Sequence, residues 1–403
     1  MKPPKGAKVI EKLVLETESK ILLLVLDGVG GLPVNGKSEL ETATTPNLDR
    51  LARESSLGFF VPVLPGITPG SGPGHLALFG YDPTRYEIGR GILECLGLDM
   101  EVRPGDLTAR GNFATLSAGI ITDRRAGRIS NEENARIMGY LKEKVKRIED
   151  VEIILQSGAE HRFAVIFRGE ALSDKLTDAD PHESGRPPVK AHPLEPGAEK
   201  SARIVNRFIE EATKALEREK LANTVLLRGF SLSPVIPSLK TRFKLNPACV
   251  ATYPMYRGIA RLLGMTVLDS GETVIEEFNA VKKNFNRFNF FYLHIKKTDS
   301  YGEDGNFEAK VKLVEEVDRA MPLVLDQGFD VIAVTGDHST PSLMRKHSWH
   351  PVPLLIWSKY VFPDDAVRFT ERECVKGILG HIQGYHLMNI LLANAMKLDK
   401  FGA

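Results

Sequence analysis

Cysteine is scarce in this chain of 403 residues, which contains only Cys95, Cys249 and Cys374. The three are far apart and show no spacing typical of a metal site. A small, odd number excludes a disulfide framework and fits a reducing compartment. We therefore expect buried free thiols in a cytoplasmic protein.

An excess of charge of one sign is also absent, because 53 basic residues face 52 acidic residues and the net charge is +1. This balance excludes a general binder of nucleic acid or of anionic membranes. The strongest apolar run, residues 21–26, is far too short to cross a bilayer, and residues 1–20 contain no signal-peptide core. We expect no nucleic-acid partner and no membrane partner.

Apolar runs that are present predict a parallel β-sheet. Residues 21–26 and 331–335 are almost wholly apolar, as in strands buried on both faces. Strands and helices alternate up to about Gly105, and the buried-strand pattern returns after Leu232 with runs at 248–252, 266–268, 290–294 and 352–357. A second short strand is predicted at 59–64, and a helix with Thr45 as its N-cap.

The middle of the chain has a different texture, with short mixed strands, arginine-rich loops and helices near 131–148 and 197–219. The chain is too long for one ordinary core. We predict an α/β protein with a doubly wound core domain, split into residues 1–105 and 232–403. A smaller α+β domain, residues 106–231, is inserted in it.

Acids and imidazoles follow several predicted strands, at the edge where open α/β sheets bind ligands. The candidates are Asp27, Asp337 and His338 after apolar runs, Asp299 and Glu303 after the run at 290–294, and His347 with His350 as a competitor. Asp27 taken alone is more typical of an acid that caps loop amides, and residues 299–303 also fit a solvated acidic loop. Together they predict two metal sites with mixed oxygen and nitrogen ligands, suited to Mn²⁺, Zn²⁺ or Mg²⁺.

Ser71 lies in the sequence Pro-Gly-Ser-Gly, just before a predicted helix. One interpretation is a simple N-cap serine. The other is a nucleophile, since a helix N-terminus favours anions and flanking glycines allow a substrate to approach closely. A metal ion would activate the hydroxyl.

Arginines are concentrated in the predicted insertion. Residues 122–128 contain Arg124, Arg125 and Arg128 in a short turn, and His161 and Arg162 lie in a second polar segment. Arginine forks suit carboxylates and phosphates, although a charge run is often only a solvated surface. These residues are candidates for substrate binding.

The chain resembles the archaeal-type cofactor-independent phosphoglycerate mutases, within the alkaline phosphatase superfamily. The resemblance covers nearly the whole length, and the following segments carry it: 26–30, 43–49, 70–71, 75–76, 79–83, 89–91, 110–115, 123–128, 335–338 and 400–403. Segments 80–83 and 123–128 are specific to that branch, whereas Asp27 and Asp337-His338 indicate only the superfamily.

The resemblance implies an isomerase of glycolysis and gluconeogenesis that interconverts 3-phosphoglycerate and 2-phosphoglycerate without bisphosphoglycerate. It implies two divalent ions, Mn²⁺ first and Mg²⁺, Zn²⁺ or Co²⁺ as alternatives. One ion would be held by Asp27, Ser71, Asp337 and His338, and the other by Asp299, Glu303 and His347. Ser71 would carry the phosphoryl group, Asp123 would transfer protons, and Arg124, Arg125, Arg128, Arg228 and Arg257 would bind the carboxylate and phosphate. A small-molecule substrate is the implied partner, and a homo-oligomer is open.

The chain departs from the family pattern at four positions. Glu303 stands where histidine is usual, Gly31 where aspartate is common, Arg257 where lysine is expected, and Gly74 where alanine is usual. Two other functions stay open. One is a phosphatase or phosphodiesterase with the same metal ligands, and the other is a metal-dependent binding protein without turnover.

Overall fold

The computed structural model describes residues 5–86 and 88–402, and the chain forms two compact units. Unit 1 comprises residues 1–87, 236–253 and 259–403, and unit 2 comprises residues 88–235 and 254–258. The chain therefore leaves unit 1, forms unit 2 and returns, and unit 2 is longer than the predicted insertion of residues 106–231. The catalytic and substrate-binding roles assigned to the two parts stay a prediction.

Unit 1 is built on one mixed sheet with the strand order β10-β9-β11-β1-β12-β13-β2-β14. The first five of these strands are parallel, β13 is antiparallel to β12 and β2, and β14 is parallel to β2. The strands are β1 (Ile21–Leu26), β2 (Ser56–Val61), β9 (Pro247–Ala251), β10 (Thr266–Val267), β11 (Phe290–Ile295), β12 (Val331–Thr335), β13 (Val352–Ser358) and β14 (Gly380–Gln383). The predicted doubly wound α/β class is confirmed.

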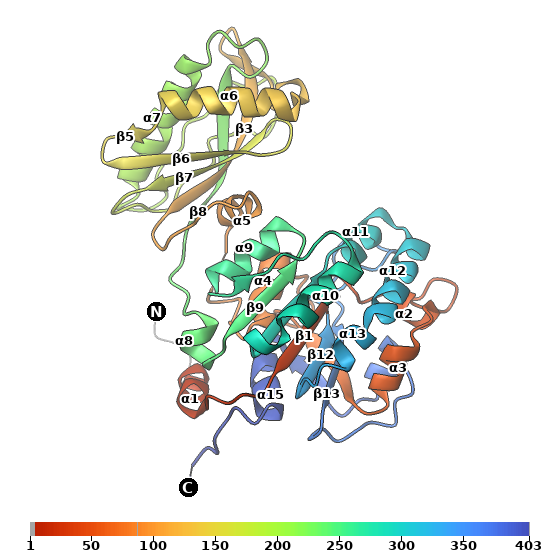
Figure 1. Cartoon of the computed structure of the whole chain (residues 1–403). Coiled ribbons are helices and arrows are strands. Elements are labelled where there is room, and N and C mark those ends of the chain that lie inside the picture. The colour runs from red at the N-terminus through yellow and green to blue at the C-terminus, as the bar shows by residue number, and fades with distance from the viewer. Residues whose placement is uncertain (1–4, 87, 403) are drawn as a thin grey trace. The chain divides into compact units, whose positions relative to one another are not determined.

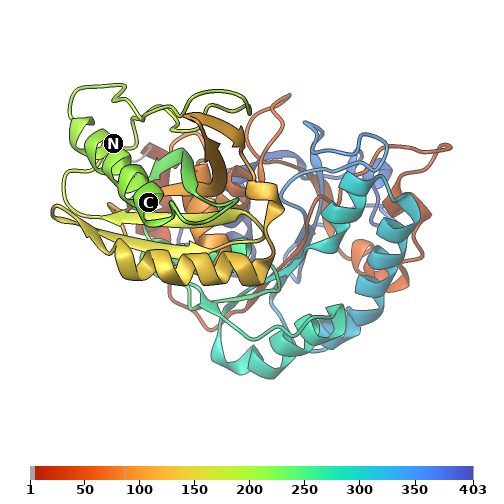
Figure 2. The same cartoon turned by 90° about the horizontal axis from the view of Figure 1, so that it is seen from above.

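Helices lie on both faces of this sheet. In Figure 1 and Figure 2, α10, α12 and α13 lie on one side, and α4 and α15 on the other. The helices of unit 1 are α1 (Lys5–Leu13), α2 (Glu39–Thr42), α3 (Pro46–Ala52), α4 (Ser71–Leu78), α8 (Leu239–Phe243), α10 (Val274–Asn284), α11 (Lys297–Asp304), α12 (Phe307–Ala320), α13 (Pro322–Leu325), α14 (Glu371–Cys374) and α15 (Leu387–Asn394). Helix α9 (Pro254–Leu262) has residues 254–258 in unit 2 and its other residues in unit 1.

The central strand β1 has the predicted bounds because every one of its side chains is apolar and buried. It pairs in parallel with β11 on one side and β12 on the other. The carboxyl ends of three neighbouring strands therefore meet at one edge of the sheet.

One local prediction was wrong. The strand expected at 59–64 is β2, Ser56–Val61, since the segment that follows it turns away at the Gly/Pro-rich stretch. Thr45 is the N-cap of α3 with Pro46 as its first residue, as predicted, although the hydroxyl of Thr45 makes no capping bond and lies 3.1 Å from Asp49 Oδ1. The amides of Asn47 and Leu48 donate instead to the carboxylate of Asp318.

Unit 2 contains a sheet with the order β4-β3-β7-β6-β5, to which β8 adds by pairing with β3. Its strands are β3 (Leu107–Ser117), β4 (Ile120–Asp123), β5 (Arg147–Ile148), β6 (Val151–Ser157), β7 (Arg162–Arg168) and β8 (Thr224–Leu232). Helices α6 (Asn131–Lys144) and α7 (Glu199–Ala215) contribute to its main core, which includes Phe113, Phe167 and Phe208. Cys95 of α5 (Arg90–Gly97) packs with Ala164 and Ile166 of β7.

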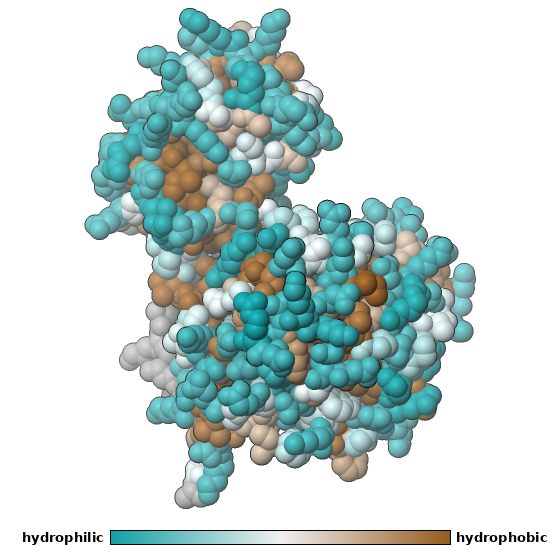
Figure 3. Space-filling view, viewed as in Figure 1, coloured by the Kyte–Doolittle hydropathy of each residue, from teal (hydrophilic) through white to brown (hydrophobic). Residues whose placement is uncertain are grey.

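The visible surface of both units is mostly hydrophilic in Figure 3. Within the described part of the chain, no helix combines the length and the apolar character that a membrane span requires.

Candidate active site

Two groups of metal-binding side chains lie at the carboxyl ends of β11, β1 and β12. Asp27 follows β1, Asp337 and His338 follow β12, and Asp299 lies in the first turn of α11, just after β11. Ligand atoms of Asp27, Asp337 and His338 lie within 4.8 Å of one another, and so do those of Asp299, His338 and His347. The structure thus brings together five of the predicted metal ligands, and His338 belongs to both groups.

The first group is completely buried, with no exposed area at Asp27, Asp337 or His338. His338 Nε2 lies 3.3 Å from Asp27 Oδ1 and 3.3 Å from Asp337 Oδ2. Among the described residues, none of these three atoms has a hydrogen-bond partner. Buried carboxylates rarely remain without partners, so this donor set fits a divalent cation.

The two carboxylates of this group titrate differently. Burial and the nearby charge of Asp27 raise the pKa of Asp337 to about 7. Burial also opposes ionisation of Asp27, but the hydrogen bond and charge of His294 and the charges of His338 and Lys296 keep its pKa well below the usual value. A bound cation would favour ionisation of both carboxylates.

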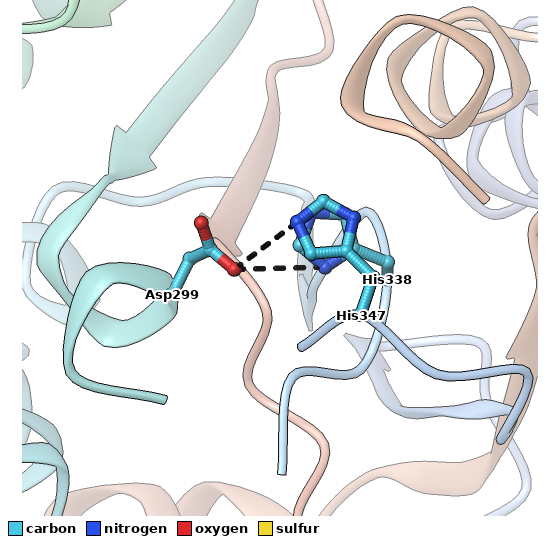
Figure 4. Close-up of side chains that lie close together, drawn as sticks. All are labelled: Asp299, His338 and His347. Carbon is cyan, nitrogen blue, oxygen red and sulfur yellow. Dashed lines mark ion pairs between the residues drawn. The ribbon is translucent and has the colours of Figure 1, made fainter. Parts of the chain in front are cut away.

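The second group faces the first through His338. Figure 4 shows the carboxylate of Asp299 directed at the stacked rings of His338 and His347. Asp299 Oδ1 lies 3.5 Å from His347 Nε2 and 4.0 Å from His338 Nδ1, and the ring centroids are 3.6 Å apart. Thr340 orients this group, since its hydroxyl donates to Asp299 Oδ1 at 2.6 Å and lies 3.0 Å from His338 Nδ1.

Glu303 lies at the rim of the second group. Helix α11 places Asp299 and Glu303 one turn apart, as predicted from their spacing, and Glu303 Oε1 is 3.8 Å from His347 Nε2. Its side chain is 54% exposed. His350, the competing ligand, lies outside both groups, with Nδ1 3.1 Å from Ser348 Oγ.

Ser71 is the first residue of α4, and Gly70 is the N-cap. The N-cap interpretation of Ser71 is therefore wrong, and in the described part of the chain its half-buried hydroxyl has no hydrogen-bond partner. The same segment contacts both metal groups. Pro69 O lies 3.1 Å from His347 Nδ1, and His75 Nδ1 lies 2.8 Å from Ser71 O and 3.2 Å from Asp337 Oδ2.

Lys296, which the sequence did not single out, lies between the groups. Its Nζ is 3.2 Å from Asp27 Oδ2 and 2.5 Å from Asp299 Oδ2. Although burial opposes it, the charges of these two aspartates raise the pKa of Lys296. The carboxylates of Asp27 and Asp299 thus favour a positive charge at the position of the Lys296 ammonium group. The adjacent acids were the only sequence signal for it.

Unit 2 contains a cavity of about 210 Å³ lined by basic side chains. Its lining includes the predicted residues Arg124, Arg125, Arg128, His161, Arg162 and Arg228, together with Arg110 and Asn112, which were not predicted. Burial, and then the charges of Arg162, Arg125 and Arg110, lowers the pKa of His161 to about 4. The positive charge of the cavity favours a compact anion.

Some predicted residues have other contacts. The guanidinium of Arg124 donates to both oxygens of the buried Asp180 at 2.8 and 2.6 Å, and Asp123 accepts from the amides of Arg125 and Gly127. These bonds shape the turn at 122–128. Arg257 lies on α9 and is not in the lining of the cavity.

Carboxylates and imidazoles at parallel strand ends, beside a serine at a helix N-terminus, define the site of a metal-dependent phosphoryl-transfer enzyme. The model of the 2,3-bisphosphoglycerate-independent phosphoglycerate mutase family matches residues 52–222. A probable 2,3-bisphosphoglycerate-independent phosphoglycerate mutase of Thermotoga neapolitana is 54% identical, over 98% of this chain and 99% of its own. One from Aquifex aeolicus is 53% identical, over 98% and 100%.

A solved structure supports the same assignment. The cofactor-independent phosphoglycerate mutase from Thermoplasma acidophilum superposes with a TM-score of 0.80 at 33% identity, over 94% of this chain and 100% of its own. The chain belongs to the family of 2,3-bisphosphoglycerate-independent phosphoglycerate mutases.

Proposed function

We propose that this protein is a phosphoglycerate mutase that interconverts 3-phosphoglycerate and 2-phosphoglycerate through a phosphoserine at Ser71. The pair of metal groups beside a serine with an unpartnered hydroxyl is the observation that supports this most. The basic cavity of unit 2 adds a site for the carboxylate and phosphate of the substrate.

Asp27, Asp337 and His338, with Ser71, would hold one divalent ion, and Asp299, His347 and Glu303 the other. The ions would lower the pKa of the serine hydroxyl and stabilise charge on the phosphoryl oxygens. Mixed oxygen and nitrogen ligands suit Mn²⁺, which we propose over Mg²⁺, Zn²⁺ and Co²⁺. No bisphosphoglycerate is needed, because the serine itself stores the phosphoryl group.

In the forward direction Ser71 loses its hydroxyl proton, its Oγ attacks the phosphorus of 3-phosphoglycerate, and the bond from phosphorus to the C3 oxygen breaks. That oxygen gains a proton, and glycerate remains bound by the arginines of unit 2. The C2 hydroxyl then loses its proton and attacks the phosphoserine, which releases 2-phosphoglycerate and restores Ser71. The carboxylate of Asp123 is bonded to turn amides, so we propose that it orients Arg125 as well as exchanging protons.

A ³¹P NMR time course of the purified protein with Mn²⁺ and 3-phosphoglycerate tests this function. We expect a growing signal of 2-phosphoglycerate with little inorganic phosphate. Inorganic phosphate alone would instead support a phosphatase. Ser71→Ala should lose turnover by roughly three orders of magnitude or more while keeping its metal, since a covalent nucleophile is not replaceable. Full activity of Ser71→Ala would refute the phosphoserine.

A further inference from the structure

Lys310 of α12 is a completely buried lysine behind the metal groups. Its Nζ donates to the carbonyl oxygens of Gly28 at 2.9 Å, Thr340 at 2.8 Å and Gly30 at 3.4 Å. Three acceptors match the three N–H bonds of an ammonium group, whereas a neutral amine has only two. A buried lysine is costly unless it is satisfied in this way.

The three carbonyls belong to the two loops that carry the metal ligands. Gly28 directly follows Asp27, and Thr340 comes two residues after His338. The hydroxyl of Thr340 in turn contacts two residues of the second group, Asp299 through Oδ1 and His338 through Nδ1. Through Lys310 the backbone after β1 is therefore tied to the backbone after β12, and through Thr340 to α11.

Glu39 supplies the opposite charge. It is completely buried, and its Oε1 lies 3.7 Å from Lys310 Nζ and accepts from the amide of Ser342 at 3.0 Å. A β-carbon on Gly31 would overlap Glu39 Oε2. Gly31 therefore leaves room for this carboxylate, which accounts for the missing aspartate at position 31 in physical terms.

We propose that Lys310, with Glu39 as its counter-charge, is a positioning residue that holds both metal-binding loops in the geometry that binds the ions. The ammonium of Lys310 takes the place that a monovalent cation would fill among these carbonyls. This inference rests on the proposed function only in that it assigns the two groups to metal ions. An ordinary core ion pair would bond to the wider fold, but here all three carbonyl acceptors lie in the metal-binding loops.

The test is the affinity of the purified protein for Mn²⁺, measured by calorimetry without substrate. Lys310→Met should bind Mn²⁺ about 10- to 100-fold more weakly, the usual cost of losing a group that orients metal ligands. Lys312→Met is the matched control, because Lys312 lies on the same helix and is exposed. Its Mn²⁺ affinity should equal that of the wild type.

Cation rescue separates positioning from packing. Lys310→Ala leaves a space lined by carbonyl oxygens, so ammonium or potassium should restore Mn²⁺ affinity and tetramethylammonium should not. If Lys310→Met or Lys310→Ala fails to fold, the pair Lys310→Met with Glu39→Gln buries no lone charge and is measured in the same way. Unchanged Mn²⁺ affinity in the folded variants, even with lowered thermal stability, would overturn the proposal.

The result also separates the two proposals. A wild-type protein that binds Mn²⁺ but forms no 2-phosphoglycerate refutes the proposed function, while weak binding by Lys310→Met still supports the positioning role. Normal mutase activity together with normal Mn²⁺ affinity in Lys310→Met refutes the positioning role alone.

Discussion

Asp27 and Asp337 are two buried carboxylates that share one imidazole, and they carry opposite pKa shifts. His294 and Lys296 stabilise the charged form of Asp27. Burial and the charge of Asp27 raise the pKa of Asp337 to about 7. When no cation is bound, the pair therefore holds about one proton below pH 7 and loses it above pH 7. Any cation that binds there must displace this proton.

This proton makes metal affinity dependent on pH. Below pH 7 Asp337 is protonated and its proton competes with the cation. As the pH increases, the apparent Mn²⁺ affinity should therefore rise by up to about 10-fold per pH unit and level off above pH 7. Calorimetry in two buffers of different ionisation enthalpy should show close to one proton released at pH 6 and far fewer at pH 8.5. Asp337→Asn should lose the slope, and an equal proton count at both pH values in the wild type would contradict the assignment.

Helix α4 depends on a close approach between two backbones. Gly74 lies one turn after Ser71, and an added β-carbon would overlap the carbonyl oxygen of Asp337. The helix that carries Ser71 therefore packs directly against the backbone of Asp337, two residues after the end of β12. Gly74, at a position where the family resemblance led us to expect alanine, allows this close approach.

Gly74→Ala should move α4 away from Asp337, with a loss of about 1–3 kcal/mol in stability and a clear fall in kcat. Gly139→Ala is the matched control, because Gly139 lies exposed in α6 and an added β-carbon meets no atom within 4 Å. That change should stabilise the protein by about 0.5–1 kcal/mol. Steady-state kinetics and thermal melting would check both variants, and normal kcat in Gly74→Ala would contradict the close approach.

Helix α10 carries a buried acid, Glu277, at a cavity of about 240 Å³. Burial raises its pKa to about 8, against the charge of Lys297 and with that of Glu316. The folded state thus binds a proton that the unfolded state releases above its pKa of 4.5. Stability from this group is complete below about pH 4.5 and is lost as the pH rises to 8.

Glu277→Gln should therefore be at least as stable as the wild type. The difference in the free energy of unfolding should be largest at high pH. We expect a gain of about 2–4 kcal/mol at pH 9, measured by urea unfolding, and a smaller difference at pH 6. Glu272→Gln lines the same cavity but is exposed, so it should change neither value. The same stability for wild type and Glu277→Gln at pH 9 would show that Glu277 ionises freely.

For the molecule as a whole, the sequence predicted the core of the sheet better than its edges. The strands β1, β11 and β12 are almost wholly apolar, so the sequence predicted their positions and the acids that follow them. By contrast β8, β14 and the helices α5 and α10 were missed, because their polar and apolar residues are mixed. Lys310 and Glu39 could not be predicted, since they meet only after distant loops fold together.

The basic cavity of unit 2 should determine whether glycerate, the leaving group of the first step, stays bound to the protein. Arg125 lines the cavity, whereas the fork of Arg124 is bound to the buried Asp180. Substitution of these two arginines should therefore have different effects. Arg124→Ala leaves the buried Asp180 with only the amide of His182 at 2.9 Å and the guanidinium of Arg228 at 3.9 Å, so its main effect should be a loss of about 1.5–3 kcal/mol in stability.

Arg125→Ala should keep its stability but lose a charge-assisted hydrogen bond to glycerate, worth about 1.5–3 kcal/mol. Glycerate would escape before its second hydroxyl attacks the phosphoserine, and water would then take the phosphoryl group. The ratio of inorganic phosphate to 2-phosphoglycerate, followed by ³¹P NMR, should rise by about ten-fold or more. Arg203→Ala, an exposed change on α7 at a residue paired with Glu149, should leave the ratio unchanged. Equal ratios in Arg125→Ala and Arg203→Ala would exclude Arg125 from holding glycerate and leave that task to the more deeply placed Arg110 and Arg228.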